Sequence, residues 1–310
     1  MTETTKAALE RYRQLAAAGD AARTVHCRDL VTSYYNLVTD LYLEGWGTSH
    51  HFAPVKPGDS HADALAARQK FLAARAGLHP GMKVLDVGSG VGGPALHIAG
   101  ISGAHVTGLD ITPLRVEHAR RRACDLGLQE RTAFVEGDAM HMPFEDASFD
   151  VVYVLEALCH TADKYRSHAE IARVLTPGGL SIGYEWLAAD GLTAAEAHHL
   201  IEPVCHYHGL PNISTPGQLA DQLRRAGLTD IVVGDPEATG DLTPTWDYLD
   251  QLADLGEQLD DSPVRTFMIH GARALTRAAR EGAFLIEFWQ ARKPMARDGN
   301  ARRVSQGSAQ

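Results

Sequence analysis

The residues with the clearest chemical meaning form a glycine-rich turn that starts with a carboxylate. The turn covers residues 86–93, with the sequence DVGSGVGG. The glycines let the backbone turn sharply after a strand, and they let a ligand approach without a Cβ in the way. The helix that follows presents its N-terminus, the positive end of its dipole, to the same place. We therefore predict a small-molecule site at this turn.

Two more carboxylates follow the next two predicted strands. Asp110 ends the second strand, where a carboxylate can accept hydrogen bonds from both hydroxyls of a ribose. Asp138 lies in the segment Gly137-Asp138-Ala139 after the third strand, at the adenine end of such a ligand. Strand tips of a parallel sheet meet at one edge, so these groups are expected to face the same site as the glycine turn.

The turn also fits the G-x-G-x-x-G pattern of nicotinamide-dependent dehydrogenases, through Gly88, Gly90 and Gly93. Asp86 weighs against that alternative. A carboxylate two residues before the first glycine would repel a pyrophosphate, whereas it favours a cationic amino-acid group. The second carboxylate at Asp138 and the segment 143–150, which leads into the fourth strand, point the same way.

Taken in order over roughly residues 80–185, these motifs resemble those of the class I methyltransferases that use S-adenosyl-L-methionine (SAM). The matching segments are Val84 to Gly92, Gly108 to Asp110, Glu136 to Ala139 and Arg173 to Gly179. The resemblance implies SAM as cofactor and S-adenosyl-L-homocysteine (SAH) as product. The implied cofactor-binding residues are Asp86, Gly88, Gly90, Asp110, Ile111, Gly137, Asp138 and Ala139.

The resemblance also implies a role for individual cofactor residues. Gly88 and Gly90 are expected to lie against the cofactor, and Asp110 to hold its ribose. Ile111 is expected to pack on the adenine, and Asp138 to contact the adenine amine.

Two aromatic-rich segments resemble a narrower family, the sterol C-24 methyltransferases and related alkene C-methyltransferases of natural-product pathways. The first covers residues 34–54, YYNLVTDLYLEGWGTSHHFAP. The second is EALCH at 156–160, together with YEW at 184–186. Beyond about residue 190 the resemblance fades, and that half would contain much of the acceptor pocket. The expected acceptor is therefore a terpenoid, sterol-like or prenylated molecule, with no single compound favoured.

Alkene methylation explains the residue types in these segments. An alkene is a weak π nucleophile that no base can improve, so the enzyme must rely on alignment and exclusion of water. The attack leaves a carbocation, which aromatic faces and carboxylates stabilise until a base removes a proton. The catalytic candidates are Glu156, His160, Tyr184 and Glu185. The substrate-binding candidates are Tyr35, Trp46, His50 and Trp186.

The elements that must position these residues alternate along the middle of the chain. Strands are expected at 83–87, 105–110, 132–136, 149–155, 179–186, 231–234 and 283–289, with helices at 92–101, 113–126 and 163–175. Such alternation implies crossover units and a parallel sheet covered on both faces. The predicted fold class is α/β: a seven-stranded, mostly parallel Rossmann-like methyltransferase sheet with helices on both faces and an N-terminal helical cap.

The domain boundaries follow from the same pattern. Residues 1–78 are expected to form the helical cap, with a substrate-contacting segment, and residues 79–294 the methyltransferase domain. Insertions at 190–215 and 240–281 are expected to build the acceptor pocket. Residues 295–310 are polar and small, which predicts a mobile tail. The N-terminal helices could cap their own subunit or a neighbour's, so a homo-oligomer stays open.

The composition of the chain argues against a nucleic-acid partner and against stable insertion into a membrane. Asp and Glu outnumber Lys and Arg by 39 to 29, a net charge of −10 with no basic stripe, so no nucleic-acid partner is expected. No apolar run reaches the ~18 residues of a membrane span, and none resembles a signal peptide, so no stable membrane insertion is expected. The four cysteines lack a C-x-x-C pair, which favours reduced thiols and the cytoplasm.

A short stretch rich in possible metal ligands covers residues 198–208, with four histidines and Cys205. Imidazole and thiolate bind zinc, but no closed four-ligand spacing accompanies them, so no metal is predicted. An amphipathic helix and loop over the acceptor pocket are favoured instead. A prenyl diphosphate acceptor would require clustered basic residues or a magnesium site, and neither stands out, so a neutral terpenoid ranks higher.

Three alternatives remain beside alkene methylation. The same sheet serves O- or N-methylation of a small natural product, with His160 or a neighbour as general base. A SAM-binding scaffold or sensor without transferase activity would keep the glycine turn, but an aromatic, His- and Glu-lined mouth would have no purpose in it. The nicotinamide-dependent dehydrogenase ranks last.

Overall fold

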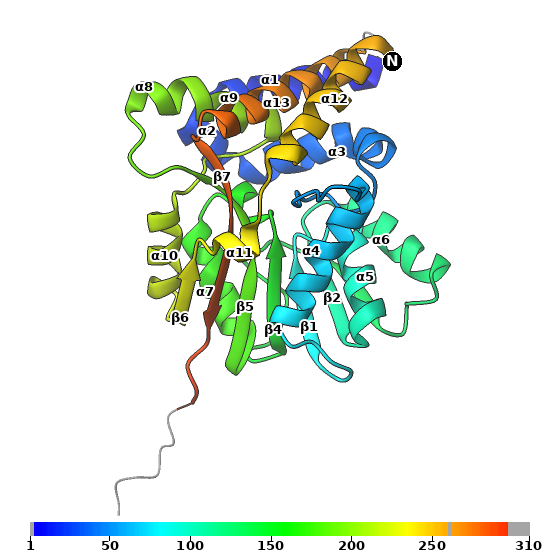
Figure 1. The fold of residues 1–310 in the computed structure, drawn as a ribbon, viewed down its shortest axis with the longest axis vertical. Helices are drawn as coiled ribbons and strands as arrows, with labels where there is room; N and C mark the ends of the chain where they lie inside the picture. Colours follow the sequence, from blue (N-terminus) through cyan, green and yellow to red (C-terminus); the bar gives the residue numbers. More distant parts are fainter. Residues whose placement is uncertain (1–2, 260–261, 297–310) are drawn as a thin grey trace, which may run out of the picture.

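The computed structural model describes residues 3–259 and 262–296, and its centre is a seven-stranded sheet (Figure 1). The strand order is β3-β2-β1-β4-β5-β7-β6. The strands are β1 (Lys83–Val87), β2 (His105–Asp110), β3 (Thr132–Glu136), β4 (Phe149–Leu155), β5 (Leu175–Ala188), β6 (Thr229–Val233) and β7 (Phe284–Arg292). Strands β1 to β5 pair in parallel, and β7 runs antiparallel to both β5 and β6. The predicted fold class is confirmed.

Helices cover both faces of the sheet. On one face lie α4 (His61–Arg75), α5 (Gly93–Ser102) and α6 (Pro113–Asp125), and on the other lie α7 (Lys164–Val174) and α10 (Pro216–Arg225). Neighbouring residues of one strand point to opposite faces, so Val84 joins the first core and Leu85 the second. This double burial explains why the parallel strands read as continuous apolar runs.

A layer of helices covers one end of the sheet (Figure 1). It contains α1 (Glu3–Ala17), α2 (Asp20–Val25), α3 (Cys27–Gly45), α9 (Glu202–His208), α12 (Thr243–Leu259) and α13 (Pro263–Arg280). A small core of its own includes Tyr12 and Tyr34 from the N-terminal helices and Phe267 from α13. The cap is thus assembled from three separate parts of the chain: the N-terminal segment and both predicted insertions.

An ion pair between a buried arginine and a half-buried glutamate ties two of these parts together. The guanidinium of Arg23, in α2, contacts both carboxylate oxygens of Glu202, in α9, at 2.6 and 2.8 Å. A charge buried this deeply, with 1% of the Arg23 side chain exposed, is retained only when it is paired. The remaining short elements are η1 (Leu158–His160), α8 (Ala194–Glu196), η2 (Ala197–Ile201) and α11 (Pro236–Thr239).

The structure differs from the sequence-based expectations in a few boundaries. Helix α4 falls inside the predicted cap range 1–78, but it packs beside α5 on the sheet. Strand β5 extends beyond the predicted 179–186 at both ends, because Leu175 pairs with Phe149 of β4 and β7 pairs with β5 as far as Ala188. The predicted tail at 295–310 lies outside the described residues from 297 onward.

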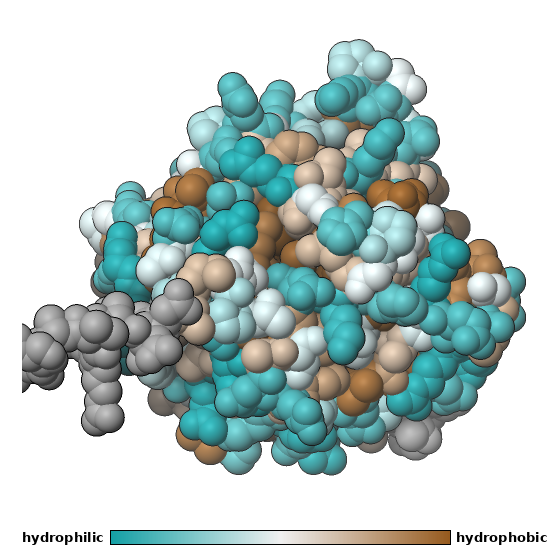
Figure 2. All heavy atoms as spheres, turned by 90° about the horizontal axis from the view of Figure 1, so that it is seen from below, coloured by the Kyte–Doolittle hydropathy of each residue, from teal (hydrophilic) through white to brown (hydrophobic). Residues whose placement is uncertain are grey.

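The face away from the cap is mostly hydrophilic, with hydrophobic residues in small separate groups (Figure 2). Within residues 3–259 and 262–296, no helix combines the length and the apolar character that crossing a bilayer requires.

Candidate active site

A first cavity, here called the glycine-loop cavity, lies at the carboxyl ends of β1, β2 and β4. Six of the eight predicted cofactor residues line it: Gly88, Asp110, Ile111, Gly137, Asp138 and Ala139. Asp86 and Gly90 are not among its lining residues. Cys27 and Val31 of α3 close it from the cap side.

Backbone geometry explains the glycines of the turn. Gly88 has φ +78°, and a Cβ there would lie 2.2 Å from the Cβ of Ala157. A Cβ on Gly93 would lie 2.0 Å from the carbonyl oxygen of Thr48. Only glycine fits such close approaches, so the chain after α3 can lie directly on the start of α5.

The three carboxylates of the site have different surroundings. Asp110 accepts hydrogen bonds from the N–H groups of Gly90 and Thr112, each at 2.9 Å, so it also fixes the turn itself. Asp138 lines the cavity and accepts from the N–H of Met140 at 2.8 Å. Burial raises the pKa of Asp86 to about 7, although the hydroxyl of Tyr153 beside it acts in the opposite direction. Asp86 therefore offers a buried acceptor beneath the turn.

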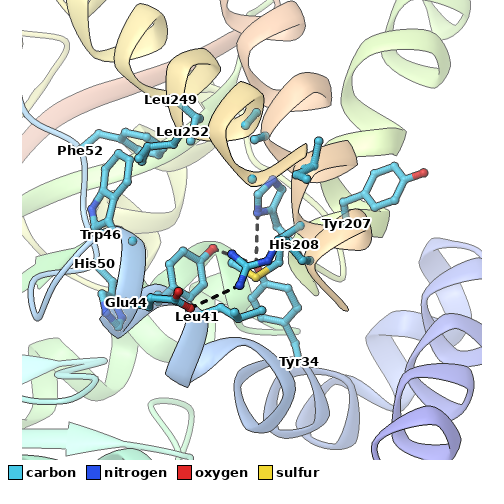
Figure 3. A pocket seen from close by; sticks show the side chains of 18 of the residues that line it. Tyr34, Leu41, Glu44, Trp46, His50, Phe52, Tyr207, His208, Leu249 and Leu252 are labelled. Atoms are coloured by element: carbon cyan, nitrogen blue, oxygen red, sulfur yellow. Dashed lines mark hydrogen bonds and ion pairs between the residues drawn. The ribbon is translucent and has the colours of Figure 1, made fainter. Parts of the chain in front are cut away.

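A second and larger cavity, here called the apolar cavity, lies between the sheet and the cap. Its volume is about 260 Å³, against about 80 Å³ for the glycine-loop cavity. Trp46, Phe52, Leu249 and Leu252 lie together on one side of it, opposite Tyr34 and His208 (Figure 3). Residues from both predicted insertions line it, including Tyr207 and His208 of α9 and Met268, Ile269 and Ala272 of α13.

The two cavities meet at four side chains that line both of them: Tyr35, His50, Glu156 and His160. All four were singled out from the sequence. Of the other acceptor-side candidates, Trp46 and Trp186 line the apolar cavity alone. The two cavities are therefore adjacent at these four side chains, which we call the junction.

Glu156 follows β4 with a left-handed backbone, φ +58°, which is unusual for a residue with a Cβ. Its carboxylate accepts hydrogen bonds from the N–H of Phe52 at 2.8 Å and from the indole N–H of Trp186 at 2.7 Å. Burial raises its pKa to about 8, although nearby Arg68 acts in the opposite direction. Strained residues persist where their surroundings hold them, and they gather at active sites.

Tyr35 and His160 lie beside Glu156 at the junction. The phenol oxygen of Tyr35 is 2.8 Å from Nε2 of His160. The other ring nitrogen, Nδ1, faces the carbonyl oxygen of Gly209 at 3.4 Å. Burial holds the pKa of His160 near 3, helped by the positive charge of Arg115, so its imidazole is neutral at physiological pH.

Two predicted catalytic residues are not brought to either cavity. The hydroxyl of Tyr184 donates to the carbonyl of Ala238 at 2.9 Å, and the Arg68 guanidinium lies 3.9 Å over its ring. The carboxylate of Glu185 accepts from the N–H groups of Leu158 and Cys159, at 2.9 and 3.2 Å. Both side chains therefore support the walls of the site instead of lining it.

Arg115 is a site residue that the sequence-based reasoning missed. It lines the glycine-loop cavity, and its guanidinium lies 3.9 Å over the ring of Tyr35. It also contacts Nδ1 of His50 at 3.0 Å and Asp110 at 3.8 Å. A cation in the first turn of a helix is unfavourable to the helix dipole, and Arg115 is the third residue of α6. This unfavourable position was the sequence signal that could have marked Arg115 as a functional residue.

The glycine-loop cavity fits SAM on three observations. Positive φ angles at Gly88 and Gly90 form a turn that leaves backbone exposed to a ligand. Asp110 and Asp138 place carboxylates in the cavity at two strand tips, where ribose and adenine need acceptors. Asp86 places a buried carboxylate beneath the turn, as an ammonium group requires. Within the described residues, no group of three or more His, Cys, Asp or Glu side chains is placed to hold a metal ion.

Comparison with known proteins identifies the family. A family model described as a methyltransferase domain matches residues 85–183. A sterol 24-C-methyltransferase of Eremothecium gossypii is 36% identical over 250 residues, which cover 77% of this chain and 67% of the relative. A cycloartenol-C-24-methyltransferase of Arabidopsis thaliana is 37% identical over 224 residues, covering 72% of this chain and 67% of the relative.

Other relatives are matched over a smaller share of their length. A sterol 24-C-methyltransferase of Gibberella zeae is 49% identical over 168 residues, which are 54% of this chain but only 44% of that protein. Among solved structures, the geranyl diphosphate C-methyltransferase of Streptomyces coelicolor A3(2), in complex with Mg²⁺, geranyl diphosphate and SAH, has a TM-score of 0.65 at 18% identity. The superposition covers 86% of this chain and 98% of that structure's chain, and it shows that the two share a fold.

The residues that the family model matches, 85–183, contain the glycine turn, Asp110 and Asp138, and the junction residues Glu156 and His160. They account for SAM as the cofactor and for methyl transfer as the reaction class. The chain belongs to the sterol C-24-methyltransferase family, within the class I methyltransferases that use SAM.

Proposed function

We propose that this enzyme transfers a methyl group from SAM to an alkene carbon of a terpenoid, sterol-like or prenylated small molecule. The observation that carries the proposal is the junction of the two cavities at Tyr35, His50, Glu156 and His160. A cavity that holds the carboxylates of Asp110 and Asp138 there shares its wall with an aromatic and aliphatic one. The relatives' names, which specify methylation at C-24 of sterols and cycloartenol, support an alkene acceptor.

SAM supplies an electrophilic methyl group, and the residues of this chain bind SAM, align the acceptor and stabilise the charge that develops. The glycine turn and Asp110 would hold the cofactor in the smaller cavity, while the apolar cavity aligns the alkene and excludes water. The new C–C bond leaves a positive charge on the neighbouring carbon. The Glu156 carboxylate and the rings of Tyr35 and Trp186 stabilise that charge from the cavity wall.

The apolar character of the larger cavity supports a neutral acceptor. Its lining includes one ion pair, between Glu44 and Arg265 at 3.5 Å, amid mostly aromatic and aliphatic residues. All four cysteines are unpaired thiols, which supports work in a reducing compartment such as the cytoplasm. A pathway of secondary metabolism would supply a terpenoid of suitable size.

One observation favours a second candidate, O- or N-methylation of a small natural product. A neutral His160, hydrogen-bonded to Tyr35 at the junction, could take a proton from an acceptor hydroxyl or amine. We rank it second because the aromatic wall and Glu156 would have no task in O- or N-methylation.

A pair of acceptors that differ only in saturation tests the proposal. Prenylated alcohols and their hydrogenated analogues carry the same heteroatoms, but only the first retain the double bond. Turnover confined to the unsaturated member of each pair is the expected result. Equal turnover of both members would mean that the methyl group goes to the heteroatom, and the alkene proposal would fail.

A further inference from the structure

The hydrogen bond between Tyr35 and His160 joins two titratable side chains at the cavity junction. We propose that this pair is the acceptor of the proton that ends the reaction. The phenol oxygen of Tyr35 takes the proton from the methylated cation, while the tyrosine's own proton passes to Nε2 of His160. The inference rests on the proposed alkene methylation and adds to it the route by which the cation is quenched.

The tautomer of His160 sets the direction of the transfer. Its Nδ1 faces the carbonyl oxygen of Gly209, a group that can only accept a hydrogen bond, so Nδ1 carries the ring hydrogen. The lone pair then lies on Nε2, 2.8 Å from the Tyr35 oxygen. Tyr35 must therefore donate its hydroxyl hydrogen to Nε2, which leaves the lone pairs of the phenol oxygen as acceptors.

The carbonyl that fixes this tautomer is itself fixed by the fold. Helix α9 ends at His208, and Gly209 caps it in the left-handed conformation, with φ +67° and ψ 37°. A Cβ on Gly209 would lie 3.0 Å from the Cβ of Tyr34, in the cap core. The second half of the chain thus contributes a backbone group to the site, in a region where the sequence motifs have faded.

The other two junction residues use their acceptor atoms in hydrogen bonds that hold the site together. Both oxygens of Glu156 receive N–H donors, from Phe52 and from Trp186. In His50, Nδ1 faces the Arg115 guanidinium, which can only donate, and Nε2 faces the carbonyl of Gly47. Tyr35 differs from both because its oxygen is hydrogen-bonded directly to Nε2 of His160, which can take over the phenol's own proton as a new one arrives.

The charges around Tyr35 and His160 favour transient protonation of the pair and fast release of the proton. The Arg115 guanidinium over the ring stabilises negative charge on Tyr35 during transfer, although burial raises the pKa of the phenol overall. The groups that face His160 include the cations Arg115 and Lys164 as well as His208, and all of them disfavour an imidazolium. A weak base suffices, because a carbocation is a very strong acid, and a weak base returns its proton quickly.

The step balances in atoms and electrons. The C–H bond next to the cationic carbon breaks, and its electron pair forms the new double bond. The released proton binds to Tyr35 Oη, and the former phenol proton binds to His160 Nε2. The resulting imidazolium, with its Nδ1 hydrogen toward Gly209, loses a proton to solvent after product release, which restores the starting pair.

Substitution of Tyr35 by Phe tests the proposal, with wild-type enzyme and an alkene acceptor as reference. Tyr35→Phe removes the accepting oxygen but keeps the ring, so kcat should fall by about 10²- to 10⁴-fold, the usual contribution of a positioned proton acceptor. SAH affinity by calorimetry should stay within about threefold. The trapped cation should also yield alcohols or shifted alkenes, which gas chromatography with mass spectrometry detects. His160→Gln should show the same product change, and the double variant should be no slower than Tyr35→Phe alone.

Tyr165→Phe serves as a control, because it removes a phenol hydroxyl on α7, where the ring contacts Arg225, and Tyr165 lines neither cavity; its kcat and products should match wild type. Wild-type products at an unchanged rate in Tyr35→Phe would overturn the dyad. So would parallel losses of kcat and SAH affinity, which would make Tyr35 a cofactor residue. If the wild-type enzyme itself labels oxygen or nitrogen, the proposed function fails first, and the two failures are thereby distinguished.

Discussion

Glu185 and Lys164 both bind the turn that carries His160: Glu185 binds its backbone N–H groups, and Lys164 binds its backbone carbonyls. The Glu185 carboxylate accepts the N–H groups of Leu158 and Cys159, and the Lys164 ammonium donates to the carbonyls of Cys159 and Thr161, at 3.3 and 2.8 Å. Both side chains are buried, so the opposite charges act at low dielectric. We infer that Glu185 is a positioning residue that acts through η1.

Replacement of Glu185 by Gln should therefore lower turnover more than cofactor affinity. The amide keeps one acceptor oxygen but turns an N–H₂ group toward a backbone N–H, which should displace the turn and misplace His160. Misplacement by about 1 Å costs on the order of 10²-fold in rate, so kcat should fall about 10- to 100-fold. SAH affinity, measured by calorimetry, should change less than threefold. Glu287→Gln is the matched control, because Glu287 lies opposite Glu185 in the register with β7. Equal losses in kcat and affinity would count against the positioning role.

Removal of the Asp110 carboxylate should weaken cofactor binding. Hydrogen bonds to a charged group contribute about 1.5–3 kcal/mol each, so Asp110→Ala should reduce SAM and SAH affinity by at least tenfold. The same change removes the acceptor for the N–H groups of Gly90 and Thr112, so the melting temperature should fall as well. Asp110→Asn removes the charge but keeps an acceptor oxygen, whereas Asp110→Ala removes both. SAH affinities of the two variants, measured by calorimetry, therefore separate the effect of charge from that of hydrogen bonding. Unchanged affinity in both variants would show that the ribose lies elsewhere.

Cofactor binding should depend on pH through Asp86. Its pKa of about 7 in the folded protein lies above the ordinary value, so the ionised partner of an ammonium group forms only as pH rises through 7. SAH affinity should therefore increase between about pH 6 and 8, and Asp86→Asn should flatten this profile. A wild-type profile as flat as that of the variant would contradict the role of Asp86.

The same raised pKa has the opposite consequence for stability. The folded state holds the Asp86 proton more tightly than the unfolded state, so this contribution is present in full below about pH 4 and is lost as pH rises through 7. In the absence of cofactor, Asp86→Asn should thus gain thermal stability relative to wild type as pH increases over that window. Differential scanning calorimetry at pH 5 and pH 8 measures the difference.

The rate of methyl transfer should follow the ionisation of Glu156. Only the carboxylate form opposes a developing positive charge, and its pKa of about 8 leaves much of it protonated at neutral pH. At saturating SAM, the ratio kcat/KM for the acceptor should rise with pH and level off above about 8. Glu156→Gln should be slower and should lack this limb, while its SAH binding keeps the pH dependence assigned to Asp86. A limb that persists in Glu156→Gln would assign the titration to another group.

The sheet and the cofactor side could be predicted from sequence because their signals are local. Strand, glycine turn and carboxylate follow one another within a few residues, as in 83–93, and the strand tips converge by the geometry of a parallel sheet. The predicted strands β1 to β4 are reproduced at their expected boundaries.

The acceptor side was harder because it depends on contacts between distant segments. Tyr184 and Glu185 were predicted as site residues, yet their side chains are bound elsewhere, to the carbonyl of Ala238 and to the η1 turn. Arg115 and the Gly209 carbonyl carry no motif, and only tertiary packing brings them to Tyr35 and His160. The cap is also assembled from three separate stretches of chain, which periodicity alone cannot join.

The most direct test of the central claim is the position of the transferred methyl group. The enzyme is incubated with [methyl-¹³C]SAM and a prenylated or sterol-like alkene, and the purified product is examined by ¹³C NMR. The account predicts a label bonded to carbon, on one of the two former alkene positions, with the heteroatom count unchanged. A label bonded to oxygen or nitrogen would contradict it.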